Sequence, residues 1–236
     1  MVGGTIAPAR SRSPYNPRVP PPLHRTVRSL GLVSLLTDAS SEMIYPLLPA
    51  FLTGTLRAGP AFLGVVEGLA EAVAAAVKIV SGRVSDRLPR RKPLVVAGYT
   101  LSSLVRPMVA LATVPGHVLA VRVLDRIGKG VRGAPRDALL AEVVPPGDRG
   151  RAFGFQRAMD HAGAMVGPLL ASAALLVTSD LRVVFALAAV PAALAVATLV
   201  WGVREVARPS GPPAAAPPSS NGSSLEPALA RYLGVL

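Results

Sequence analysis

Residues 183–203 read VVFALAAVPAALAVATLVWGV, 21 consecutive residues without a charged side chain. A helix of this length extends about 30 Å, which matches the hydrocarbon thickness of a bilayer. Residues 162–179 form a second uncharged stretch, 18 residues long, just before it. Both stretches satisfy the hydropathy criterion for transmembrane helices. They predict that the chain is an integral membrane protein.

The composition of the whole chain agrees with a lipid environment. Hydrophobic residues make up 51% of its 236 residues and charged residues 16%, against about 25% charged in soluble domains. Four further segments of membrane length are interrupted by charges but bounded by turn-like sequences such as Pro115-Gly116. We therefore expect an all-α integral membrane fold, a six-transmembrane-helix bundle, with spans at about residues 28–53, 61–82, 93–113, 117–142, 158–179 and 182–203.

The regions outside the bundle, which covers residues 28–203, differ from it in composition. Residues 1–27 are basic and rich in proline, which predicts a disordered cytoplasmic tail. Residues 204–227 are rich in Pro, Ser, Gly and Ala and are typical of a flexible cytoplasmic linker. Residues 228–236, ALARYLGVL, resemble the start of a truncated seventh span, with a short C-terminal tail as the alternative.

The net charge of +12 comes almost entirely from residues outside the spans, because acids and bases nearly balance within them. Lys and Arg flanking the spans number 16 on the side of the N-terminus and two on the opposite side. This asymmetry predicts a multi-pass protein of the cell (inner) membrane with a cytoplasmic N-terminus, and it disfavours a nucleic-acid-binding surface. The chain has no cysteine, metal-ligand pattern or catalytic triad spacing, so we expect neither an enzyme nor a cofactor.

A motif lies between the second and third expected spans. Residues 82–94 read GRVSDRLPRRKPL, and this segment resembles the G-x-x-x-D-R-x-G-R-R signature of major facilitator superfamily transporters, with Pro89 in place of a glycine. The matching residues are Gly82, Asp86, Arg87, Arg90 and Arg91. The resemblance implies a conformational switch loop, in which Asp86 belongs to a cytoplasmic charge network that breaks when the transporter changes state.

Three further segments resemble the same family, and along the chain the signatures follow the family's order. Residues 163–172, GAMVGPLLAS, are similar to a signature of its drug/proton antiporters, and Gly163 and Gly167 lie one turn apart, which allows close helix packing beside Pro168. In span four, Arg126 and Gly130 resemble an R-x-x-q-G signature, with Lys129 in place of the glutamine. Residues 149–154, RGRAFG, resemble a cytoplasmic hinge between helices four and five.

Charged residues inside the spans are candidates for a proton-coupling site or substrate cavity. Asp38 and Glu42 lie one turn apart in span one, and Glu67 and Glu71 do so in span two. In span four, a stripe contains Asp125, Lys129, Arg132 and Arg136. The candidate set is Asp38, Glu42, Glu67, Glu71, Arg126 and Lys129.

The depth of three of these charges leaves two interpretations open. At about 1.5 Å per residue, Asp38, Glu71 and Arg126 lie at a similar depth, near the bilayer midplane. Either Asp38 or Glu71 neutralises Arg126 in a fixed ion pair, or a partly desolvated carboxylate binds and releases a proton during transport.

The resemblance implies the N-terminal six-helix half of a secondary transporter, which we expect to export a small molecule coupled to protons. Uptake or exchange of an organic anion is one alternative, and a half-bundle scaffold that does not transport is another. The family's substrate site lies between two six-helix halves. The expected partners are therefore the lipid bilayer, a small-molecule substrate, protons, and either a missing C-terminal half or a second copy.

Overall fold

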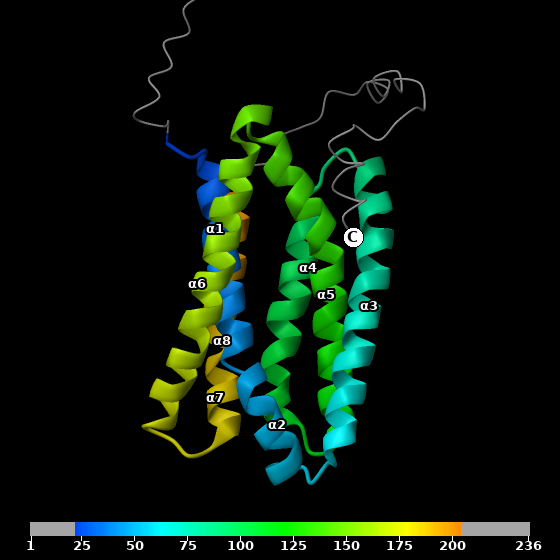
Figure 1. Cartoon of the computed structure of the whole chain (residues 1–236), viewed down its shortest axis with the longest axis vertical. Helices are drawn as coiled ribbons and strands as arrows, with labels where there is room; N and C mark the ends of the chain where they lie inside the picture. The colour runs from blue at the N-terminus through cyan, green and yellow to red at the C-terminus, as the bar shows by residue number, and fades with distance from the viewer. Residues whose placement is uncertain (1–21, 204–236) are drawn as a thin grey trace, which may run out of the picture.

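The structure, a computed structural model, describes residues 22–203, and these fold as a bundle of helices without a strand. The long helical segments run side by side along one axis (Figure 1). The expected linker at 204–227, the segment at 228–236 and most of the tail at 1–27 lie outside the described residues.

Six helical segments correspond to the six expected spans. The first comprises α1 (Arg25–Glu42), the 3-10 turn η1 (Tyr45–Leu47), α2 (Leu48–Ala50) and the π-helical turn η2 (Phe51–Thr55). The second is α3 (Pro60–Arg87), and the third joins α4 (Lys92–Val105) to the 3-10 helix η3 (Arg106–Leu111). The fourth is α5 (Pro115–Glu142), and the short η4 (Pro146–Asp148) precedes the fifth, α6 (Arg149–Leu175). The sixth combines α7 (Leu181–Leu187) and α8 (Ala189–Gly202).

The fifth span differs from its expected position. Helix α6 begins at Arg149 and ends at Leu175, so the RGRAFG segment forms the first turns of a helix and the expected hinge there was wrong. The chain turns instead before Arg149, where Pro145 and Pro146 interrupt helical hydrogen bonding. The last four residues of the uncharged stretch at 162–179 lie beyond the end of α6 at Leu175. By length and composition alone, two helical segments of the described residues are long and apolar enough to cross a membrane, Lys92–Leu111 and Leu181–Gly202.

The second span also extends beyond its expected end. Helix α3 continues to Arg87, so Gly82 and Asp86 occupy its last turns and do not lie in the connecting loop. The loop itself spans only residues 88–91, between α3 and α4.

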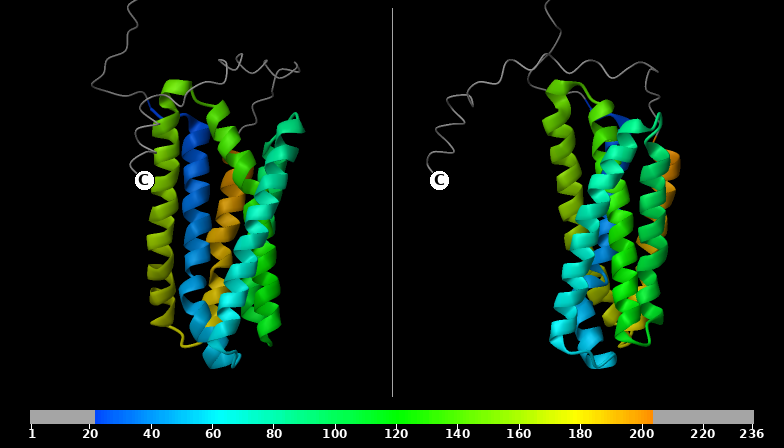
Figure 2. Two further views of the ribbon diagram at one scale, coloured as in Figure 1. Left: turned by 45° about the vertical axis from the view of Figure 1, so that its right-hand side comes forward. Right: turned by 90° about the vertical axis from the view of Figure 1, so that its right-hand side faces the viewer.

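The helices pack as two groups. Helix α1 packs on α6 and α8, whereas α5 packs on α3 and α4 (Figures 1 and 2). The groups meet mainly through α8 on α4 and α7 on η3, while α1 and α5 contact each other little. Two apolar clusters form the core, one around Phe51 and Phe185 and another around Leu30 and Leu199.

Close approach of α6 to α1 occurs at the two glycines that the sequence singled out. A Cβ at Gly167 would lie 2.6 Å from the Cβ of Glu42 and 2.7 Å from the Ala39 carbonyl oxygen. A Cβ at Gly163 would overlap the carbonyl oxygen of Leu35. Pro168 lies inside α6 without ending it. Side chains larger than hydrogen at these positions would force the two helices apart.

Candidate functional site

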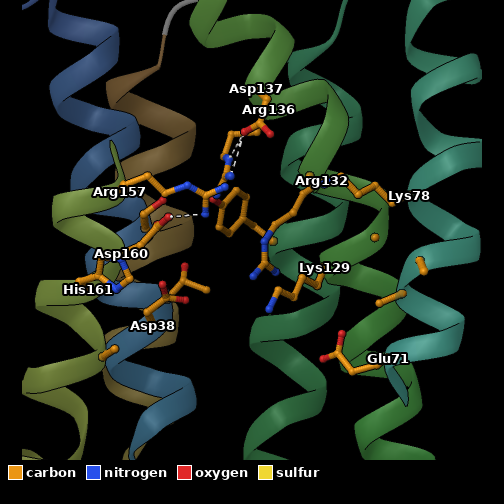
Figure 3. A pocket seen from close by; sticks show the side chains of 18 residues that line it. Asp38, Glu71, Lys78, Lys129, Arg132, Arg136, Asp137, Arg157, Asp160 and His161 are labelled. Atoms are coloured by element: carbon orange, nitrogen blue, oxygen red, sulfur yellow. Dashed lines mark hydrogen bonds and ion pairs between the residues drawn. The ribbon is translucent and has the colours of Figure 1, made fainter. Parts of the chain in front are cut away.

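A cavity of about 450 Å³ lies between α1, α3, α5 and α6, where the two helix groups face each other. Its walls carry many ionisable side chains (Figure 3). These are Asp38, Glu71, Lys78, Lys129, Arg132, Arg136, Asp137, Arg157, Asp160 and His161. A water-accessible cavity allows such charges to exist inside a membrane bundle, because each would be costly against lipid.

The wall formed by α1 and α6 is acidic. Asp38 extends from α1, and Asp160 and His161 lie beside it on α6 (Figure 3). Asp160 is held by Arg157, with 3.4 Å between Oδ2 and the guanidinium Nη1. Within residues 22–203 the Asp38 carboxylate forms no ion pair or side-chain hydrogen bond. Asp38 is therefore an intramembrane acid whose charge no neighbouring base neutralises directly.

The facing wall, formed by α5, is basic. Lys129 and Arg132 extend from α5 toward Asp38 (Figure 3). Arg132 is 6% exposed. Its Nη1 donates to the Ser102 hydroxyl at 2.7 Å, and its guanidinium lies 4.3 Å from the centre of the Tyr99 ring. Neither Lys129 nor Arg132 forms an ion pair in the described part of the chain.

The structure assigns a partner to Arg126. Its Nη2 lies 3.0 Å from Oε1 of Glu71, on the neighbouring helix α3. Of the two acids expected at this depth, Glu71 therefore forms the fixed ion pair, and Asp38 does not. Asp38 shares a smaller cavity of about 160 Å³ with Arg126, Lys129 and Glu42.

The remaining candidate acid of span two lies apart from these cavities. Glu67 lines neither of the two and instead accepts two hydrogen bonds from Arg122, one of them from Nε to Oε1 at 3.0 Å. The guanidinium of Arg122 also lies 3.7 Å from the centre of the Tyr45 ring. Glu67 and Arg122 thus form a lateral link between α3 and α5.

A buried cluster around Asp125 was missed by the sequence reasoning. Arg106 Nη2 lies 3.0 Å from Asp125 Oδ1, and both side chains are 3% exposed. The Tyr45 hydroxyl donates to the other carboxylate oxygen of Asp125, and Arg106 Nη1 donates to the Thr37 carbonyl at 3.0 Å. Asp125 was expected on the charged stripe of span four; it does not line the main cavity as the other residues of that stripe do, but pairs with Arg106. The signal for this cluster was Arg106 itself, a lone charge in an otherwise uncharged span.

Two residues of the family signature, Asp86 and Arg91, belong to a charge network at the end of the bundle where α3 and α5 terminate. Arg91 is buried and bridges two acids, with Nη2 at 3.1 Å from Asp86 Oδ1 and Nη1 at 3.0 Å from Glu142 Oε1. Arg87 and Arg90 are exposed beside it. The network joins the end of α3, the start of α4 and the end of α5. Glu142 is a member that the motif does not contain.

Comparison with known proteins gives the family. A sequence model described as Major Facilitator Superfamily matches residues 30–234. The uncharacterized MFS-type transporter MJ1317 of Methanocaldococcus jannaschii is 40% identical over 148 residues, which cover 63% of this chain and 37% of that protein. Multidrug resistance protein MdtH of Photorhabdus laumondii is 31% identical over 150 residues, covering 61% of this chain and 37% of the relative.

A solved structure shares the fold. A bacterial homolog of the human lysosomal transporter Spinster, in an inward-facing and unoccupied conformation, superimposes with a TM-score of 0.68 at 19% identity. The match covers 89% of this chain and 48% of the other. The chain thus spans less than half the length of the relatives it matches. The resemblance drawn from the motifs is confirmed: this chain belongs to the Major Facilitator Superfamily, whose members are multi-pass membrane transporters and not enzymes.

Proposed function

We propose that this chain is one half of a secondary active transporter that exports a small molecule in exchange for protons. The observation that carries the proposal is Asp38, an acid inside the bundle that faces a cavity and forms no ion pair in the described residues. An ionised carboxylate is costly at this depth, and binding a proton removes that cost. Asp38 can therefore alternate between a protonated and an ionised state as its surroundings change.

The cavity provides a place for a substrate beside Asp38. It lies between α1, α3, α5 and α6, and its volume of about 450 Å³ falls within the range of small-molecule sites. In this family the substrate lies between two six-helix halves. A C-terminal half, or a second copy of the chain, would supply the facing wall.

Direction and membrane orientation are parts of the same proposal. Export is supported by the similarity to multidrug resistance protein MdtH and by the antiporter-like segment containing Gly163, Gly167 and Pro168. A cytoplasmic N-terminus in the cell inner membrane is supported by the 16 flanking bases on that side against two on the other.

The test uses the full-length protein in everted membrane vesicles with a preformed pH gradient. Probes are added one at a time: ethidium, phenylalanine, 2-phenylethylamine and 3-phenylpropanoate. Exchange for protons is reported by the gradient dissipation that exceeds the passive dissipation in vesicles lacking the protein. At least one probe should dissipate the gradient, and Asp38→Asn should abolish the response because asparagine cannot carry the proton. The matched control is Asp148→Asn, at the start of α6 and outside both cavities.

Two results would contradict the proposal. Gradient dissipation that persists in a well-folded Asp38→Asn protein would remove Asp38 from proton coupling. Absence of any response in the wild-type protein would reject proton exchange itself. The organic-anion alternative retains support from the unpaired bases Lys129 and Arg132, and a response to 3-phenylpropanoate alone would favour it.

A further inference from the structure

The main cavity holds charges of opposite sign that face each other without pairing. Half of the ionisable groups on its walls have an ion-pair partner: Arg136 pairs with Asp137, Arg157 with Asp160, and Glu71 with Arg126 outside the cavity. Asp38 on α1, and Lys129 and Arg132 on α5, have no ion-pair partner among the described residues. Lys78 on α3 and His161 on α6, both exposed, also line the cavity without an ion-pair partner among the described residues. A space between opposite, unpaired charges suits a ligand that carries both signs.

The position of Arg132 is fixed by its neighbours. Ser102 accepts the hydrogen bond from Arg132 and donates its own proton to the Asp125 carbonyl at 3.1 Å, so the hydroxyl is held in place. Helices α4 and α5 also pack closely here, because a Cβ at Gly98 would lie 2.8 Å from the Cβ of Arg132.

A guanidinium held in this way has further N–H groups available for a ligand. Arginine carries five N–H donors in a planar fork, and Ser102 uses one of them. The fork matches the two oxygens of a carboxylate or a phosphate. Lys129, one turn before Arg132 on α5, adds a second positive charge on the same wall. The α5 wall is therefore a ready-made subsite for an acidic group.

We infer that the cavity binds a small zwitterion, whose acidic group contacts Lys129 and Arg132 and whose protonated amine contacts Asp38. A simple anion would leave the Asp38 carboxylate unpaired and would be repelled by it. A simple cation would leave Lys129 and Arg132 unpaired and would be repelled by them. This inference rests on the proposed function and deepens it, because the amine and the coupling proton then compete for one carboxylate.

The experiment compares three probes that share one scaffold and differ in charge. Phenylalanine is the zwitterion, 2-phenylethylamine lacks the acidic group, and 3-phenylpropanoate lacks the amine. Binding to the full-length protein in lipid nanodiscs is read from the thermal shift at increasing probe concentration. The zwitterion forms one charged contact that each analogue lacks, and such a contact contributes about a factor of ten in affinity. Phenylalanine should therefore bind about tenfold more tightly than either analogue.

Two substitutions assign the ends of the zwitterion. Lys129→Gln should abolish the higher affinity for phenylalanine than for 2-phenylethylamine. Asp38→Asn should abolish the higher affinity for phenylalanine than for 3-phenylpropanoate. Arg132→Gln should have the same effect as Lys129→Gln. Because Arg132 also contacts Ser102 and Tyr99, Arg132→Gln can misfold, and Lys129→Gln then provides the test of the acidic subsite. Arg28→Gln is the charge-matched control, since Arg28 is exposed on α1 and lines neither cavity.

The outcomes separate this inference from the proposed function. Equal binding of phenylalanine and either analogue, or no binding of any of the three, would overturn the inference. Proton exchange driven by ethidium alone would then leave the proposed function standing. Selective binding of the zwitterion with no gradient dissipation would support the inference and reject proton exchange.

Discussion

Replacing Asp125 by asparagine removes the charge that neutralises Arg106 in the interior of the bundle. The two side chains are 3.0 Å apart and each is only 3% exposed, so solvent can replace little of the lost carboxylate's interaction with Arg106. Breaking a buried ion pair by removing one partner costs about 3–5 kcal/mol, because an uncompensated charge remains. Asparagine keeps the shape of the side chain and an oxygen that can accept from Tyr45, so most of the loss should come from Arg106. We expect Asp125→Asn to lower the free energy of unfolding by about 3–5 kcal/mol.

The ion pair between Glu71 and Arg126 provides a matched control for the pair between Asp125 and Arg106. Glu71 and Arg126 are also 3.0 Å apart, but the Glu71 side chain is 61% exposed. Pairs screened by water contribute about 1 kcal/mol or less. Glu71→Gln should therefore cost much less than Asp125→Asn, although both changes remove one carboxylate from an arginine.

The measurement is equilibrium unfolding in mixed micelles, followed by circular dichroism of the helices. The double variant Asp125→Asn with Arg106→Gln removes both buried charges, and it should recover a large part of the stability lost in the single variant. A cost for Asp125→Asn as small as that for Glu71→Gln would refute the reasoning. The reasoning would also be refuted if Arg106→Gln lowered the stability of the Asp125→Asn protein by as much as it lowers that of the wild-type protein, because the two charges would then not be coupled.

Three further predictions concern the switch network, the helix packing and the topology. Asp86→Asn removes one of the two acids that hold Arg91, so gradient dissipation should slow while the probe-induced thermal shift stays unchanged; a normal rate would argue against a switching role. Gly167→Leu should destabilise the bundle by about 1–3 kcal/mol, as overpacking does, whereas Gly154→Ala, with no atom within 4 Å of the added Cβ, should not; equal stability of the two variants would contradict the packing argument. A cysteine in place of the exposed Pro89, in a chain without native cysteine, should be labelled only from the cytoplasmic side; labelling from outside would reverse the orientation.

Hydropathy predicted the number of helical segments and most of their positions, because long apolar stretches and turn sequences are visible along the chain. It could not predict that α6 starts at Arg149, since this helix begins with nine residues that include three arginines and resemble a loop in a hydropathy profile. The same reason explains the extension of α3 to Arg87. Helices that continue beyond the apolar core of a membrane carry no apolar signal there, so their ends require the structure.

The partners of the charged residues were predicted less well than the spans. Depth along the helices placed Asp38, Glu71 and Arg126 at one level, but an ion pair also needs the two helices to touch on the correct faces. Helix α3 packs along α5, which brings Glu71 to Arg126, whereas α1 contacts α5 little and leaves Asp38 apart. Sequence spacing gives the depth of a residue and its face on its own helix, but not which helix lies against that face.

The weak contact between α1 and α5 also explains how the cavity arises. The charged stripe of α5 faces α1 across a gap, so Lys129 and Arg132 remain separate from Asp38. Toward the end of the bundle that contains η1 and η3, the gap closes, because the Tyr45 hydroxyl reaches Asp125 and Arg106 reaches the Thr37 carbonyl of α1. This cluster ties the two helix groups together below the cavity. Since Asp125, Arg106 and Tyr45 also line the smaller cavity that contains Asp38, loss of this cluster should alter that cavity as well as the stability.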